Sequence, residues 1–130
     1  MPATATHTLG REERIKSRRL IETLFNGGHS RSTTAFPLRL VYVRIPRQEG
    51  LVPHAMMVSV SKRFFKRAVK RNRVKRQVRE AYRLNKALLP PVADDESLLM
   101  AFIWMDSELH DSHRVEKSMC RLLQKMGEKA

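Results

Sequence analysis

Apolar residues recur at helical spacing in the segment that begins at Ser17. Serine is a favoured residue ahead of the first turn of a helix, and the glycine pair at 27 and 28 is a typical helix stop. The segment therefore predicts a short helix that runs from Ser17 to the glycine pair. Its apolar face consists of Leu20, Ile21, Leu24 and Phe25.

Two segments rich in β-branched and aromatic residues follow, at 36–45 and 54–62. The first reads FPLRLVYVRI, and the second alternates loosely between its two faces. Pro46, Glu49 and Gly50 supply turn chemistry between them. The pattern predicts two strands joined as a hairpin.

The apolar pattern near the C-terminus predicts a strand and then a helix. Residues 98–105, LLMAFIWM, form an unbroken apolar run that is typical of a strand inside a sheet. Between about 106 and 125 the spacing becomes helical, so this helix should pack on the sheet and close the core. Its apolar positions are Val115, Met119, Leu122, Leu123 and Met126.

The order of elements indicates an α+β fold in a chain of 130 residues, the size of one domain. Residues 1–10 are small and polar, without periodicity, and are expected to be a flexible lead-in. Residues 11–130 are expected to form a single domain.

The segment 66–83, KRAVKRNRVKRQVREAYR, combines a helical apolar pattern with nine Lys or Arg residues and one acid, Glu80. At about 100° per residue, one side of this helix is apolar and can pack on a sheet. That side carries Val74, Val78, Ala81 and Tyr82. The opposite side carries a stripe within an arc of roughly 60°: Asn72, Arg76, Arg79 and Arg83, flanked by Arg73 and Lys75.

So many like charges weaken a helix by a few tenths of a kcal/mol for each i,i+4 pair. Only Glu80, four residues after Arg76, is expected to offset one of them. A charge run is usually a solvated helix face, but such faces interleave acids with bases. The stripe is better explained as a surface whose charges are neutralised by phosphates.

Net charge agrees with that interpretation. Twenty-six basic residues against thirteen acidic ones give +13 and a pI near 10.9, which favours nucleic acid as the partner. An eight-residue apolar run cannot span a bilayer, so no membrane partner is expected. The N-terminus has no secretory pattern, and a single cysteine, Cys120, cannot form an internal disulfide, so the cytoplasm is the expected compartment.

No motif of a protein active site is visible. His110 and His113 lie near Asp106 and Asp111, but without the framework of a metal site. Among the aromatic residues, Phe64 and Phe65 are the best candidates for stacking on bases, because basic residues bracket them.

Four segments together resemble the protein subunit of bacterial ribonuclease P: LFNGG, FPLRLVYV, VSVSKR and AVKRNRVKRQVREAYR. The resemblance runs from about residue 14 to the final helix, and its most specific element is the RNR triplet at 71–73. It implies an αβββαβα sandwich. The central four-stranded sheet would include a left-handed βαβ crossover that carries the RNR helix.

The resemblance also implies a function. The protein would bind a catalytic RNA and the 5′ leader of precursor tRNA, with one protein per RNA, and promote endonucleolytic removal of the leader to give the mature 5′ end. The RNA would hold the catalytic centre and its Mg²⁺ ions. The protein alone would hold no metal, although Asn72 would lie near RNA-bound magnesium.

Site residues follow from the same resemblance. The RNA-binding residues of the RNR helix would be Arg71, Asn72, Arg73, Lys75, Arg76, Arg79 and Arg83. A cleft between this helix and the sheet would hold the leader, lined by Ile21, Phe25, Pro37 and Arg39, with Ser59, Lys62 and Arg63 near its mouth. Arg39 stands where relatives can carry an aromatic residue, and the loop at Phe64 and Phe65 is one residue longer than in some relatives.

Charge and fold pattern alone would equally permit a structural ribosomal protein or a general RNA-binding protein. A protein-only nuclease would need a carboxylate or histidine constellation that the sequence does not display.

Overall fold

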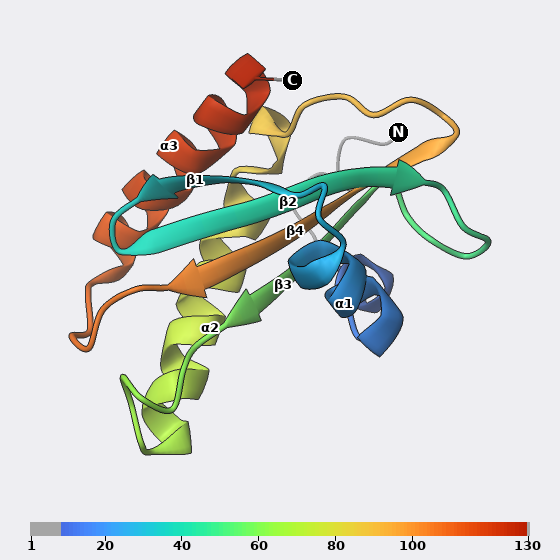
Figure 1. Cartoon of the computed structure of the whole chain (residues 1–130). Coiled ribbons are helices and arrows are strands. Elements are labelled where there is room, and N and C mark those ends of the chain that lie inside the picture. Colours follow the sequence, from blue (N-terminus) through green and yellow to red (C-terminus); the bar gives the residue numbers. More distant parts are fainter. Residues whose placement is uncertain (1–8, 130) are drawn as a thin grey trace.

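The structure is a computed structural model that describes residues 9–129. Three α-helices and four strands account for most of this part of the chain (Figure 1). Two short 3-10 helices, η2 (Arg11–Glu13) and η3 (Lys86–Leu88), complete it. The principal elements are α1 (Arg18–Asn26), β1 (Arg31–Ala35), β2 (Leu38–Pro46), β3 (His54–Ser59), α2 (Ala68–Leu84), β4 (Glu96–Trp104) and α3 (Ser112–Lys129).

The four strands form one mixed sheet in the order β1-β2-β4-β3. β2 pairs with β1 and with β4 in antiparallel fashion, whereas β3 pairs with β4 in parallel. The predicted hairpin between the strands at 36–45 and 54–62 is therefore wrong, because β4 lies between them. The apolar sequence of β4 gives the physical reason: a strand buried on both faces is most stable in the middle of a sheet.

The parallel pair is connected through α2, as the family resemblance implies. The chain leaves β3, passes through α2 behind the sheet and returns into β4 as a left-handed crossover (Figure 1). Almost all connections of this kind are right-handed, so this one is an exception. The α+β architecture and the crossover are as expected.

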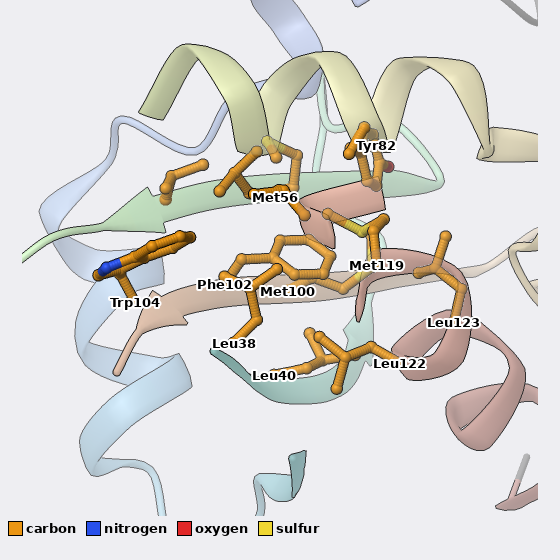
Figure 2. Close-up of a cluster of buried hydrophobic side chains, with 14 of the residues drawn as sticks. Leu38, Leu40, Met56, Tyr82, Met100, Phe102, Trp104, Met119, Leu122 and Leu123 are labelled. Carbon is orange, nitrogen blue, oxygen red and sulfur yellow. The ribbon is translucent and has the colours of Figure 1, made fainter. Parts of the chain in front are cut away.

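Two apolar clusters hold the helices on opposite faces of the sheet. On one face, α2 and α3 cover a cluster in which Phe102, Trp104 and Met119 are fully buried (Figure 2). On the other face, α1 covers a smaller cluster that includes Leu24, Val41 and Leu99. Successive apolar residues of β2 and β4 thus point alternately to one cluster and the other.

The apolar faces predicted for the second and third helices are confirmed, whereas that of the first is confirmed only in part, because Phe25 is 41% exposed. Val74, Val78, Ala81 and Tyr82 are the buried residues of α2. The five apolar positions of the last helix are also buried, although α3 begins at Ser112 rather than near 106. At α1, the Ser17 hydroxyl accepts a hydrogen bond from the amide of Leu20, as a helix cap does.

The N-terminal segment lies along the outer edge of β3. The amide of Ile15 donates to the carbonyl of Met56 at 2.8 Å, and Glu13 forms an ion pair with Lys86 at 2.5 Å. Leu9 packs against the α2 side of the core. The folded unit therefore begins at least two residues earlier than predicted, and the rest of the predicted lead-in, 1–8, lies outside the described residues.

Candidate nucleic-acid interface

The outward side of α2 carries the predicted stripe, defined here as Asn72, Arg76, Arg79 and Arg83. Asn72 and Arg76 are exposed, and Arg79 and Arg83 are partly exposed. The helix points these side chains outward because its opposite side is held in the core by Val74 and Val78. These four residues, henceforth the α2 stripe, line one wall of a groove of about 580 Å³.

The N-terminal segment supplies the other wall of this groove through Leu9 and Arg14. Sequence reasoning did not select Arg14 as a site residue. It reaches the stripe because the segment adds to the edge of β3, where Arg14 forms an isolated bridge with Met56. A pattern confined to one helix could not have found it.

Positive charge is concentrated along this groove. The pKa of Arg79 is lowered, first by its partial burial and then by the nearby charge of Arg14. Within residues 9–129, the side chains of Asn72, Arg76 and Arg79 make no hydrogen bond or ion pair. Their donors are thus available to an external anion.

Glu80 pairs with Arg83 rather than with Arg76. Its carboxylate accepts two hydrogen bonds from the Arg83 guanidinium, at 3.0 and 2.5 Å. This pairing lowers the pKa of Glu80 and raises that of Arg83. The prediction that Glu80 offsets the charge of Arg76 is therefore wrong. The Arg76 guanidinium has no acidic partner within residues 9–129 and can pair with a phosphate.

The flanking basic residues of α2 divide into two groups. Arg71 donates to the carbonyls of Phe65 and Lys66, at 2.8 and 2.7 Å, and so holds the loop ahead of the helix. Arg73 is exposed and Lys75 is partly exposed, on either side of the stripe. Arg71 thus has a structural role in the free protein that the sequence did not predict.

The predicted leader-cleft residues mostly lie on the other face of the sheet. Strand pairing aligns Thr34, Arg39, Ile103 and Ser59 in one row across all four strands. At about 4.8 Å per strand, this row is roughly 14 Å long. α1 covers only part of this face, and Phe25, which is 41% exposed, stands beside the row. We call this surface the α1 face.

A hollow of about 240 Å³ on the α1 face brings Phe25 and Arg39 together. Ile21 packs partly buried beside it in the smaller apolar cluster. The cleft was expected between the RNR helix and the sheet, and that placement is wrong. α2 packs tightly on the opposite face through fully buried side chains, whereas α1 leaves the end of the sheet open.

The remaining predicted cleft residues are more scattered. Pro37 is buried in the turn between β1 and β2, where its carbonyl accepts from the amide of Met105 at 2.8 Å. Lys62 and Arg63 lie in the exposed turn after β3, next to the end of the row at Ser59. Lys62 and Arg63 thus follow the end of the row along the chain, whereas Pro37 lies in the β1–β2 turn.

The two candidate stacking residues, Phe64 and Phe65, belong to the core side of the loop. Phe65 is 5% exposed, so it cannot stack on a base, and Phe64 packs partly buried against the core. The Arg63 guanidinium lies 5.2 Å from the centre of the Phe64 ring. The base-stacking interpretation of Phe65 is therefore wrong.

The His110 Nε2 donates a hydrogen bond to the Asp106 carboxylate at 2.7 Å, but no group of three or more metal-ligating side chains occurs within 9–129. Across the same residues, every helix is too short or too polar to cross a membrane.

The pKa of the Cys120 thiol is raised, first by burial and then by the nearby Glu116. This makes the thiol a poorer nucleophile.

The chain is similar to known proteins of one family. The profile of the family described as Ribonuclease P matches residues 9–127. The chain belongs to this family. It is 43% identical over 125 residues to the ribonuclease P protein component of Porphyromonas gingivalis, covering 95% of this chain and 89% of that protein. It is 32% identical to the component of Chlorobaculum tepidum, covering 76% and 68%.

Solved structures of ribonuclease P proteins share the fold. The protein from Thermotoga maritima superposes with a TM-score of 0.67 at 24% identity, covering 87% of this chain and 96% of that one. The protein from Staphylococcus aureus gives 0.64 at 18% identity, covering 88% and 94%. At these identities the superpositions support the architecture alone.

Proposed function

We propose that the chain is the protein subunit of ribonuclease P and acts in 5′ maturation of tRNA. In this proposal it binds the catalytic RNA and the 5′ leader of precursor tRNA, and so promotes endonucleolytic removal of the leader. The observation that carries the proposal is the α2 stripe, in which Asn72, Arg76 and Arg79 make no hydrogen bond or ion pair within residues 9–129, on a helix whose other side is in the core. Membership of the family supplies the identity of the RNA.

The α2 stripe is suited to the phosphates of a structured RNA. Arginine presents a planar fork of donors that matches phosphate oxygens, and three of the four stripe residues are arginines. Arg14 extends the same surface from the N-terminal segment. Asn72 adds an amide that can both donate and accept, so it can contact a ribose or a base as well as a phosphate.

The α1 face is suited to a single-stranded leader. Single strands are bound by aromatic rings that stack on bases and by cations that follow the backbone. Phe25 supplies an aromatic ring and Arg39 a cation beside the same hollow. Lys62 and Arg63 extend the positive charge at the far end of the row. In this proposal the α2 stripe binds the RNA subunit and the α1 face binds the leader.

Hydrolysis is assigned to the RNA and its Mg²⁺ ions. The residues of the α2 stripe do not fit a metal held by protein alone, because a magnesium ion needs several oxygen ligands and the stripe offers one, the Asn72 amide, among cations. When bound by RNA, magnesium would activate water and stabilise the leaving group. The side chains of this protein bind, orient and neutralise phosphates.

The expected compartment is the cytoplasm, and the expected stoichiometry is one protein for each catalytic RNA. Both belong to the proposal. A sedimentation measurement of the reconstituted complex tests the stoichiometry directly.

Reconstitution tests the proposed function. The protein is added to its cognate catalytic RNA and a precursor tRNA at low magnesium concentration, and the rate of 5′ maturation is measured. We expect a large gain over RNA alone, lost in Arg76→Ala/Arg79→Ala and retained in Arg18→Gln/Arg19→Gln, a pair of exposed arginines on α1. No gain with the unmodified protein would sink the proposal, and recovery of ribosomal RNA alone after crosslinking in cells would favour a ribosomal role.

A further inference from the structure

A second basic stripe runs along α3, on the side that faces the edge of β1. Four cations recur at i, i+3, i+7 and i+11, within an arc of roughly 80°: Arg114, Lys117, Arg121 and Lys125. The first three are exposed. Lys125 donates to the carbonyl of Thr34 at 2.7 Å, which fixes the stripe against the strand edge.

A groove of about 780 Å³ lies between this stripe and the turn from β1 to β2. Phe36 forms one wall, and Arg114, Lys117 and Arg121 form the other. We call it the α3 groove. One acid, Glu116, also lines it, but its carboxylate accepts a hydrogen bond from Asn85 at 3.3 Å on the α2 side. The balance of charge in the groove is positive.

Phe36 is an exposed ring held in a defined place. It is the most exposed phenylalanine of the described residues, at 51%. The Arg114 guanidinium donates to its carbonyl at 3.4 Å, and the His110 ring meets its ring edge to face, with centroids 6.0 Å apart. An immobilised aromatic ring beside a row of cations is the combination that binds single-stranded nucleic acid.

The α3 groove is separate from both surfaces already assigned. It borders β1, at one edge of the sheet, whereas the groove of the α2 stripe borders the N-terminal segment beside β3, at the opposite edge. Figure 1 shows α3 behind β1, away from α1. No residue lines both the α3 groove and either of the other two sites.

We propose that the α3 groove binds a single-stranded segment of RNA. A base stacks on Phe36, and the following phosphates contact Lys117 and Arg121, which are neighbours one helical turn apart. This inference rests on the proposed function only in taking RNA as the partner. The groove gives the protein RNA-binding surfaces at both edges of its sheet, so that it can hold two segments at once.

Amide NMR of the full chain with a short oligouridylate tests the groove directly. We expect saturable shifts at the amides of Phe36, Lys117 and Arg121. The affinity is read from the Phe36 amide at several salt concentrations. In Lys117→Gln/Arg121→Gln, the slope of log affinity against log salt concentration should become shallower by about 1.4 units. In Phe36→Leu, that affinity, read at Lys117 and Arg121, should fall about 5-fold or more. Absence of shifts at all three amides would overturn the inference.

The matched control is Arg18→Gln/Arg19→Gln, which removes the same charge from the exposed start of α1 and should leave the groove shifts intact. If the control weakens them equally, net charge rather than the groove binds the RNA, and the inference fails. Shifts at Arg76 and Arg79 in the same spectra report on the α2 stripe, so failure of the groove is distinguishable from failure of the proposed function.

Crosslinking in the reconstituted holoenzyme identifies the source of the strand. Thiouridine is placed either in the catalytic RNA or in the precursor, and the crosslinked peptide is sequenced. A crosslink within 114–121 from either RNA supports the groove and names its ligand. Crosslinks from neither RNA would contradict its use in the complex.

Discussion

The Glu13 carboxylate meets the Lys86 ammonium at 2.5 Å, and this ion pair joins the N-terminal segment to the short helix that follows α2. Both side chains are less than one-fifth exposed, so water screens the pair only in part. The pair helps to hold Arg14 beside Arg79. A contact made by an acid thus positions part of a cationic surface.

Glu13→Gln should loosen the N-terminal segment. The variant removes the ion pair, and we expect it to lower the free energy of unfolding by about 1 to 2 kcal/mol. Hydrogen exchange at the Ile15 amide, which donates to Met56, should accelerate. Glu12→Gln, an exposed neighbour, is the control. Equal exchange rates in both variants would show that the pair does not anchor the segment.

Arg76→Ala should reduce the salt dependence of RNA binding. Arg76 is exposed and its charge is not offset by Glu80, so it is expected to contact one phosphate. The alanine variant should lose that contact. The log-log slope of affinity against salt should fall by about one unit. Filter binding to the catalytic RNA at several salt concentrations measures it. An unchanged slope, equal to that of Arg18→Ala, removes Arg76 from the interface.

Phe25→Ala should weaken binding of precursor tRNA but not of mature tRNA. The loss of one stacked base corresponds to about 1 to 3 kcal/mol. Because Phe25 is 41% exposed, its truncation should leave the fold intact. Leu88→Ala, at 38% exposure on η3, is the matched control. Equal losses for the two tRNAs would place the leader elsewhere.

Val78→Ala should destabilise the fold without changing any charge. Val78 is fully buried between α2 and the sheet, so its truncation removes two methyl groups and leaves a cavity. We expect a loss of about 2 to 3 kcal/mol in chemical denaturation. Val69→Ala on the same helix, at 79% exposure, should have almost no effect. Similar losses in both variants would contradict the packing described for α2.

Asp106→Asn should reduce stability at neutral pH but not in acid. The hydrogen bond from His110 lowers the pKa of Asp106 below its ordinary value of 3.8. The folded protein therefore favours the carboxylate, and this stabilisation is present above pH 3.8 and is lost as the pH falls through the lower folded value. Thermal melting of the variant and of Asp94→Asn should differ at pH 6, and the difference should shrink as the pH falls below 3.8. A constant difference would assign the effect to packing.

Helical periodicity correctly predicted which side of α2 faces outward, because it depends only on local geometry. The angular positions of Asn72, Arg76 and Arg79 follow from about 100° per residue, and the structure points them outward as expected. Arg14 could not be found in this way. Its position depends on a backbone bridge to Met56, more than forty residues away, and no local pattern encodes such a contact.

Strand order was harder to predict, because pairing of neighbouring strands is the usual local outcome. The turn residues between β2 and β3 suggested a hairpin, while the apolar run of β4 required a partner on each side. β1, with the sequence RSTTA, carries too few apolar residues to be recognised and was expected only from the family resemblance. The strand order was thus indicated by the apolar sequence of β4 and not by the sequences of its neighbours.

The central position of β4 also determines when the newly made chain can fold. β2 and β3 are joined only through β4, so neither can enter a common sheet before residue 104 has left the ribosome. α2 is complete at Leu84, twelve residues before β4 begins at Glu96. During that interval the nascent chain contains the basic segment of α2 but no core to hold it as a helix. Its charged surface is therefore available to polyanions during synthesis before the fold that orients it exists.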